Sequence, residues 1–393
     1  MPAPPTLPRI PRTVWILGFV SLLMDMSSEV YHALLPAFLT ITLGLPVVAM
    51  GAIDGIAEAT ASFAKLAAGR LSDRSQRRKP WILLGYGLAA LSKPLFPLAN
   101  GALPVLGARF ADRIGKGIRG APRDAMVADE TPPEIRGAAF GLRQTLDTVG
   151  ALVAPLLAIA LMAWLADIRL VFWIAVIPAF LSFLLAFVAL REPEKHIHAK
   201  PAALFAGFRQ INSATRRVIL VGFVFSLARF SEGFLILRGL DLGLSMAWSP
   251  LVLALFNLGY VLLAFPAGAL SDRASPKGIL ASGIGCLVAA DLVLAADNGL
   301  AGLTVGVILW GAHMALTQGL FARIVADAAP EDLRATSYGA FHFASGIAAL
   351  LASLAAGLLW DKGGAAMTFT AGAAVAAMSG LLLLSLPDAR PSA

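Results

Sequence analysis

Charged residues stand at helical spacing inside long apolar stretches of the chain. Asp25 and Glu29, for example, are four residues apart, which places both side chains on one face of a helix. Charges in a hydrocarbon environment are costly unless they are paired or hydrated, so they must face a protein interior or a watery cavity. We expect such residues to bind substrate or a coupling ion. The candidates are Asp25, Glu29, Asp54, Glu58, Arg109, Arg113, Lys116, Arg143, Asp147, Arg229, Glu232 and His342.

The carboxyl group of Glu29 could gain and lose a proton during a functional cycle. Burial favours the protonated carboxyl and a nearby cation favours the ionised one, so a conformational change can drive proton exchange. The alternative is a permanent ion pair that only supports the fold. The same alternative holds for Arg143 with Asp147 and for Arg229 with Glu232, whose spacing lets each pair neutralise itself.

Motifs of enzyme catalysis are missing from the sequence. The chain contains no HExxH, no P-loop and no GxSxG, and its five histidines lack the spacing of a zinc site. We therefore expect no enzyme, no metal and no cofactor. The driving force would be an ion gradient, most simply a proton gradient.

The elements that carry these charges are predicted to be membrane helices. Of the 393 residues, 58% are hydrophobic and only 14% are charged, and the mean hydropathy is +0.78. Soluble domains carry about a quarter charged residues, whereas apolar runs of about 20 residues span a bilayer. Twelve candidate spans lie near 13–40, 46–69, 81–99, 102–126, 136–162, 168–190, 216–240, 247–270, 277–296, 300–325, 335–360 and 364–386.

The basic residues follow a topological pattern along the chain. A net charge of +7 could indicate a nucleic-acid partner, but Lys and Arg cluster in short loops such as 70–79. Loops 41–45, 99–101 and 296–299 carry neither. Because every second loop is basic, both termini and the central connection are predicted to be cytoplasmic, in a multi-pass protein of the inner (plasma) membrane without a nucleic-acid partner.

The chain also repeats itself at about half its length. The segment GRLSDR at 69–74 recurs as GALSDR at 268–273, 199 positions later, and the dipeptide Ser-Glu at 28–29 recurs at 231–232. This predicts two parallel halves, 1–190 and 216–393, joined by a cytoplasmic linker, 191–215. Such halves enclose a substrate site near the bilayer midplane. Because most charged stripes lie in the first half, we expect ion coupling to reside mainly there.

Three local patterns resemble the major facilitator superfamily, and the resemblance covers nearly the whole chain. The segment GRLSDRSQRR at 69–78 is similar to its loop signature, with Gln76 in place of the usual second glycine. The segment RIGKG at 113–117 resembles the R-x-x-Q-G pattern, with Lys116 where Gln is usual. The segment 141–158 resembles the G-(x8)-G-(x3)-G-P-(x2)-G pattern of the antiporter branches, with alanine at two of the glycines.

The resemblance implies an all-α membrane protein with twelve transmembrane helices in two pseudo-symmetric six-helix bundles, working as a monomer. It places Arg113 near the cavity, as the candidate partner of Glu29. It also assigns Gly141, Gly150 and Pro155 to close helix packing.

A separate group of residues is predicted to gate the cytoplasmic face. Asp73 stands at a helix end, where it can receive backbone N–H groups of a neighbouring helix N-terminus. Asp124 or Asp129 could pair with Arg74 or Arg77, whereas Arg78 and Lys79 are explained by topology alone. The gating candidates are Gly69, Asp73, Arg74, Arg77 and Asp129, with Asp272 and Arg273 in the second half.

Together these features predict a secondary active transporter that moves a small polar, anionic or amphiphilic solute by alternating access, coupled to protons. The antiporter-like pattern favours export. One alternative is an uptake symporter for a nutrient or an organic anion. Another is a membrane sensor that kept the fold without transporting. The expected partners are a small-molecule substrate and the lipid bilayer.

Overall fold

The computed structural model describes residues 10–75, 77–132, 135–192, 211–271, 275–317, 320–329 and 334–385, and the regular elements in these ranges are all helical. In the first half they are α1 (Arg12–Ala37, continued by a π-helical turn at Phe38–Thr42), α2 (Val47–Ser75), α3 (Lys79–Ser92), α4 (Leu95–Leu98), α5 (Ala102–Glu130), α6 (Arg136–Leu165) and α7 (Ile168–Ala189). In the second half they are α8 (Ser213–Ala228), α9 (Gly233–Asp241), η4 (Met246–Trp248), α10 (Leu251–Ser271), α11 (Pro276–Ala295), α12 (Gly299–Thr317), α13 (Leu320–Ala328) and α14 (Arg334–Leu384).

Ten segments of the described chain are long and apolar enough to cross a membrane. The 29-residue α5 is also long enough, but it carries the basic stripe. α14 bends at Gly364, whose φ of 71° is a conformation that glycine adopts without strain. The Thr368 hydroxyl after the bend donates to Ala356 O before it, at 3.2 Å, so two arms lie side by side. The all-α membrane prediction is confirmed, and the described helices are consistent with twelve passes.

Two of the expected spans are each divided into two helices. The span at 81–99 divides into α3 and α4 at Lys93 and Pro94, where proline lacks the N–H that a helix interior needs. The span at 216–240 divides into α8 and α9, because Arg229 leaves the helical conformation with ψ of 78°. The second break exposes backbone groups beside the contact between the halves.

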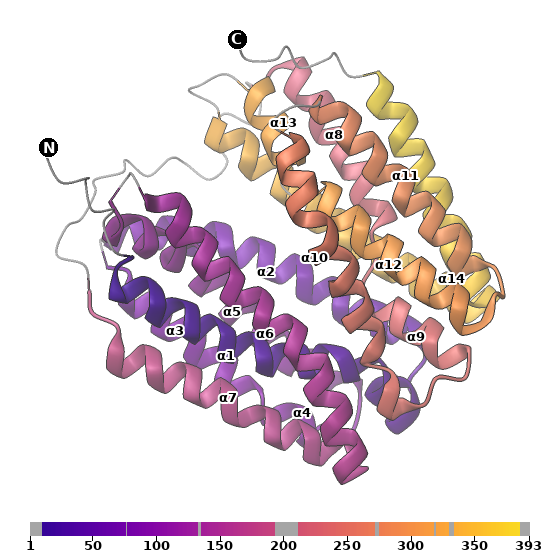
Figure 1. Cartoon of the computed structure of the whole chain (residues 1–393), viewed down its shortest axis with the longest axis horizontal. Helices are drawn as coiled ribbons and strands as arrows, with labels where there is room; N and C mark the ends of the chain where they lie inside the picture. Colours follow the sequence, from indigo (N-terminus) through magenta and orange to yellow (C-terminus); the bar gives the residue numbers. More distant parts are fainter. Residues whose placement is uncertain are drawn as a thin grey trace, which may run out of the picture.

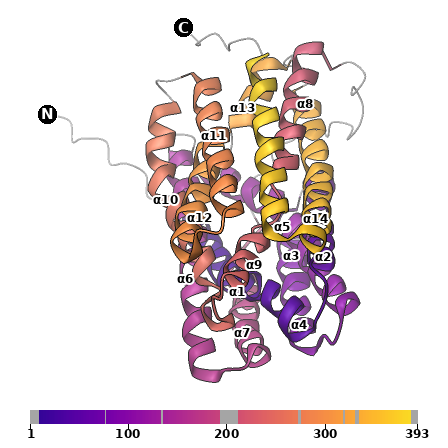
Figure 2. The same ribbon diagram turned by 90° about the vertical axis from the view of Figure 1, so that its right-hand side faces the viewer.

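The helices gather in two bundles that follow the chain order. Figure 1 shows α1–α7 in one bundle and α8–α14 in the other, with both termini toward the same end of the molecule. Figure 2, turned by 90°, shows the same division, with α11, α12 and α14 stacked over α1, α4 and α7. We call the end that bears the termini the proximal end, and the opposite end the distal end.

The two bundles pack most closely where α2 meets α14, toward the distal end. A Cβ added at Gly51 would lie 2.2 Å from Ser353 O, and one at Gly357 would lie 2.6 Å from Val48 Cα. Glycine at these positions lets the two backbones touch. The carboxylate of Asp361 also accepts hydrogen bonds from Val47 N and Val48 N at 3.0 and 2.9 Å, and so caps the first turn of α2 from the other half.

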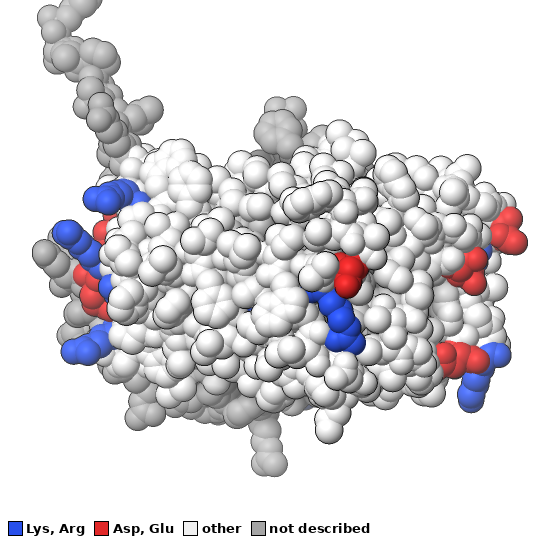
Figure 3. Space-filling view, turned by 90° about the horizontal axis from the view of Figure 1, so that it is seen from below, with Lys and Arg blue, Asp and Glu red and all other residues white. Residues whose placement is uncertain are grey.

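The outer surface has the character that lipid requires. Figure 3 shows most of the charged side chains of that face gathered at the two ends of the molecule, with a broad band between them that is uncharged except for a small acidic and basic patch near the middle. Large apolar side chains are exposed on the helices, for example Trp164, Val188 and Leu381. This band is the surface expected against the hydrocarbon core of a bilayer.

Candidate functional site

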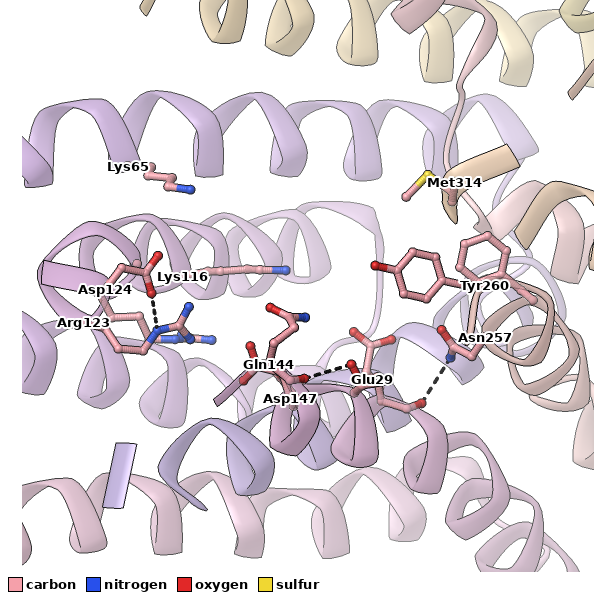
Figure 4. A pocket seen from close by; sticks show the side chains of 16 residues that line it. Glu29, Lys65, Lys116, Arg123, Asp124, Gln144, Asp147, Asn257, Tyr260 and Met314 are labelled. Carbon is pink, nitrogen blue, oxygen red and sulfur yellow. Dashed lines mark hydrogen bonds and ion pairs between the residues drawn. The ribbon is translucent and has the colours of Figure 1, made fainter. Parts of the chain in front are cut away.

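Two adjoining cavities lie between the halves. The proximal cavity, of about 350 Å³, reaches Asp124 near the end of α5, and the distal cavity has about 540 Å³. Glu29 and Lys116 line both. Figure 4 shows Lys65 and Lys116 entering the proximal cavity from α2 and α5, opposite Tyr260 of α10. Both volumes suit a small-molecule site.

Most of the site residues predicted from sequence fall on the walls of these cavities. Those on the proximal cavity are Asp25, Glu29, Lys116 and Asp147. Those on the distal cavity are Glu29, Glu58, Arg113, Lys116, Arg229, Glu232 and His342. The remaining three, Asp54, Arg109 and Arg143, are buried behind the walls.

The expected ion pair between Glu29 and Arg113 is not found. Glu29 Oε2 lies 3.3 Å from Nδ1 of His32 in the next turn of α1, and Arg113 instead pairs with Glu58 of α2 at 3.4 Å. The reason is the close packing of α5 on α2. A Cβ added at Gly117 would lie 2.8 Å from a carbonyl oxygen of α2, so the basic stripe faces α2 more closely than α1.

Asp54 forms a buried bridge between the two halves. Its Oδ1 accepts from Arg109 at 2.7 Å, and its Oδ2 accepts from the hydroxyl of Ser231 at 2.7 Å. The N–H of Ser231 in turn donates to the Ser353 hydroxyl at 3.2 Å. The α8–α9 break frees Ser231 for this role. A charge expected to bind substrate therefore holds the halves together at the wall of the distal cavity.

Sequence reasoning missed a second buried ion pair in the first half. Lys93 Nζ lies 2.9 Å from Asp112 Oδ1 and also donates to the Ser28 hydroxyl at 3.0 Å. Its ammonium lies 5.1 Å from the ring centroid of Tyr31, a cation–π contact. Both charges are almost completely buried. The available signal was a single lysine in the otherwise apolar span at 81–99.

Asp147 belongs to a chain of charges along the proximal cavity. It pairs with Arg143, as the spacing predicted, and Arg143 Nε lies 3.8 Å from Asp124. Asp124 is also 3.1 Å from Arg123, whose other nitrogen donates to Ser21. These groups largely neutralise one another, which supports the structural alternative for Arg143 and Asp147.

Four cations on or beside the cavity walls have no carboxylate within 4.0 Å among the described residues. They are Lys65, Lys116, Arg119 and Arg229. Arg119 stacks over the ring of Tyr86, with 4.7 Å from its guanidinium carbon to the centroid, and Arg229 contacts the Met314 sulfur. The expected Arg229–Glu232 pair does not form, because the helix break separates the two residues. Asp25 and Glu232, on the same walls, have no Lys or Arg within 4.0 Å among the described residues either, so both cations and carboxylates face the cavities unpaired.

The second half contributes a less charged wall. Phe256, Tyr260 and Met314 line the proximal cavity, and His342 with Trp310 lines the distal one. The sequence singled out His342 but not the aromatic residues, because apolar side chains in an apolar span give no signal of their own.

The structure describes only some of the predicted gating residues. Asp272 and Arg273 lie outside the described residues, and so do the side chains of Asp73 and Arg74. The backbone of Gly69, Asp73 and Arg74 belongs to α2. Asp129 does form an ion pair at the proximal end.

The partner of Asp129 is Arg78, at 3.4 Å, and not Arg74 or Arg77 among the pairs that the structure describes. Arg78 also donates to the Ser72 hydroxyl, and its N–H donates to Glu192, which caps α3. Topology alone therefore does not account for Arg78.

The glycines expected to pack helices differ from each other. A Cβ added at Gly150 would lie 2.8 Å from Leu22 O, so this glycine lets α6 touch α1. A Cβ added at Gly141 would meet nothing within 4 Å, so the expectation of close packing is wrong there. Pro155 lies inside α6.

Comparison with known proteins decides the family. The sequence profile of the Major Facilitator Superfamily matches residues 17–254 and 218–393, and so covers both halves. The chain belongs to the major facilitator superfamily. It is a multi-pass membrane transporter, and its expected family is confirmed.

Individual relatives of this superfamily agree with that assignment. The chain is 31% identical over 380 residues to an uncharacterized MFS-type transporter of Methanocaldococcus jannaschii, covering 95% of this chain and 94% of that protein. It is 28% identical over 206 residues to a probable 4-methylmuconolactone transporter of Cupriavidus pinatubonensis, covering 52% and 45%. The crystal structure of the nucleoside transporter NupG has the same fold, with a TM-score of 0.78 at 12% identity over 96% of this chain and 99% of that one.

Proposed function

We propose that this major facilitator superfamily protein moves an anionic or amphiphilic solute together with protons, both in the same direction, by alternating access. The observation that carries the proposal is that Lys116, which lines both cavities with Glu29, has no carboxylate within 4.0 Å among the described residues. Transport would be driven by the proton gradient, without a cofactor.

The access state follows from where the halves touch. Asp54 and Ser231 join them at the wall of the distal cavity, and Asp361 caps α2 at the distal end. The loop charges predict that the proximal end, with the termini, faces the cytoplasm. On this basis the structure corresponds to the inward-facing state, and the reverse state requires the Asp54–Ser231 and Asp361 contacts to open.

The coupling follows from the charges around Glu29. An ionised Glu29 offsets part of the positive potential of Lys116 and Arg113 in the cavity walls. A proton on Glu29 removes that negative charge and leaves Lys116 free for an anionic solute. Proton and anion therefore favour each other's binding, and this linkage is reciprocal. Such coupling produces cotransport.

The competing function is export by proton exchange, which the pattern at 141–158 favoured. One observation supports it, since Gly150 does bring α6 against α1, beside Asp25. A cationic or lipophilic solute would compete with the proton for Asp25 and Glu29, which would give exchange. The 4-methylmuconolactone transporter, a relative over about half of this chain, agrees with an organic solute but leaves the direction open.

Flux in proteoliposomes distinguishes these functions. We expect an inward proton gradient to drive accumulation of an organic anion, and the anion to carry protons with it. Glu29→Gln should bind the anion equally at mildly acidic and mildly alkaline pH, and should exchange it across the membrane without responding to the gradient. The matched control is Asp297→Asn. It removes a carboxylate whose side chain is 88% exposed and lies outside both cavities.

Two results would overturn the proposal. Protons leaving the vesicle as solute enters would establish exchange. Binding without any flux would establish a sensor.

A further inference from the structure

The proximal cavity divides its chemistry between the two halves. Every charged residue on its wall comes from the first half. The second half contributes only uncharged side chains, which are Phe256, Asn257, Tyr260 and Met314. A ligand that fits both walls needs one charged end and one apolar body.

The charged end is defined by two lysines on neighbouring helices. Lys65 of α2 and Lys116 of α5 are exposed in the cavity, and neither has a carboxylate within 4.0 Å among the described residues. A Cβ added at Gly120 would lie 3.9 Å from Lys65 Cε, so the stem of Lys65 passes over α5 at a position without a side chain. Figure 4 shows both ammonium groups reaching into the same cavity. An anion between them would relieve their mutual repulsion.

The apolar end is a rigid wall. Phe256 lies against Trp310, with ring centroids 6.1 Å apart, and the Trp310 indole N–H donates to the buried Asp291 at 3.0 Å. The Asn257 amide donates to Ala151 O at 3.2 Å, so α10 is tied to α6 of the first half. Rigid aromatic rings and a flexible, polarizable thioether are suited to bind a flat, apolar body.

We propose that the substrate is a small amphipathic organic anion with a single acidic group and a planar apolar body. Its acidic group lies between Lys65 and Lys116, and its body lies against Phe256, Tyr260 and Met314. This inference rests on the proposed function, because it names the solute for the same cavity. Asp25 and Glu29 line the cavity on α1 and disfavour a second anionic group.

A matched panel of aryl and alkyl sulfonates tests the ligand class. Sulfonates stay ionised across the pH range, so any pH dependence comes from the protein. We expect benzenesulfonate to raise the melting temperature of the purified protein. Methanesulfonate, which lacks the ring, and benzenesulfonamide, which lacks the charge, should each bind at least about tenfold more weakly. Benzylammonium should not bind.

Variants assign the two ends of the ligand. Lys116→Gln should weaken benzenesulfonate at least about tenfold, and Lys116→Arg should restore most of the affinity because it keeps the charge. Met314→Ala should weaken benzenesulfonate but leave the weak binding of methanesulfonate unchanged. Lys362→Gln, at the bend of α14 and outside both cavities, is the control. Because Lys116 has no ion-pair partner among the described residues, Lys116→Gln should keep the melting temperature of the unliganded protein.

Failure of this inference is distinct from failure of the proposed function. If benzenesulfonamide or benzylammonium binds as well as benzenesulfonate, or if Lys116→Gln has no effect, the substrate class is wrong. The coupling between protons and solute could then still be tested, by measuring proton movement with whichever solute does bind. If benzenesulfonate binds as expected but moves without protons, the ligand class stands and the coupling falls.

Discussion

The two halves of this transporter share a helix plan but handle buried charge differently. In the first half, the buried acids Asp54 and Asp112 each meet a buried cation, at 2.7 and 2.9 Å. In the second half, the fully buried Asp291 has only the Trp310 indole, and its second oxygen has no partner among the described residues. The comparison indicates that the first half carries ionic chemistry and the second carries a mostly neutral wall.

The duplicated Ser-Glu dipeptide shows how this difference arises from local structure. Ser28 and Glu29 lie within the continuous helix α1, and Ser28 accepts a hydrogen bond from Lys93 of its own half. Ser231 and Glu232 lie in the break between α8 and α9, and Ser231 donates to Asp54 of the other half. The same two residues therefore support a bundle in one copy and join the bundles in the other.

The largest expected effect comes from breaking one ion pair in the first half. Asp112→Asn leaves Lys93 buried without its carboxylate, and should lower the free energy of unfolding by about 3–5 kcal/mol. Asp291→Asn in the second half keeps an acceptor for Trp310 and removes no ion pair, so it should cost about 1 kcal/mol or less. Thermal unfolding in detergent measures both.

A double variant serves as the control for this comparison. Lys93→Met combined with Asp112→Asn removes both charges and should recover much of the lost stability. Equal losses from Asp112→Asn and Asp291→Asn would contradict the contrast between the halves.

The next largest effect comes from comparing two glycines. Gly51 lies at the close contact between the halves, whereas Gly141 lies in open space within the first half. Gly51→Ala places a methyl group 2.2 Å from Ser353 O, so the distal contact cannot close without shifting α2 or α14. We expect transport to fall by at least about tenfold, which corresponds to about 1.4 kcal/mol. Gly141→Ala meets nothing within 4 Å and should leave transport intact. Solute flux with equal protein per vesicle provides the measurement, and a loss in both variants would show that helix glycines matter for another reason.

The helical plan could be predicted from sequence because hydropathy and loop charge are local signals. Apolar runs of bilayer length, separated by short loops, gave spans near all the helices that the structure describes. Breaks were harder to predict. Pro94 was a visible signal for the break after Lys93, whereas no proline marks the break at Arg229, next to which Ser231 contacts α2 and α14.

The candidate site was predictable in its residue types but not in its pairing. Charges within spans pointed to the cavity walls, since lipid excludes them. Which carboxylate meets which cation depends on how helices pack, and Gly117 brought Arg113 to Glu58 instead of Glu29. Lys93 was overlooked because a lone charge has no spacing to reveal a partner. The aromatic wall gave no signal, because it is apolar like its surroundings.

The smallest expected effect comes from comparing two helix caps, one formed across the halves and one formed within the first half. Asp361 caps α2 from α14, whereas Glu192 caps α3 of its own half through the N–H groups of Arg78 and Lys79. Losing either cap should cost about 1 kcal/mol. Asp361→Ala should destabilise only the access state that is closed at the distal end, because the cap across the halves exists only there. The fraction of molecules open at the distal end should therefore rise about fivefold.

Chemical labelling measures this shift in access. Ala349 lines the distal cavity, and Cys286 is the only native cysteine, so Ala349→Cys in a Cys286→Ser background reports access from outside. An impermeant thiol reagent should label this cysteine faster with Asp361→Ala and at the unchanged rate with Glu192→Ala, although both lower the melting temperature. Equal labelling in the two variants would mean that the Asp361 contact does not distinguish the access states, and the distal closure would then rest on the Asp54–Ser231 contact and on the close packing of α2 against α14.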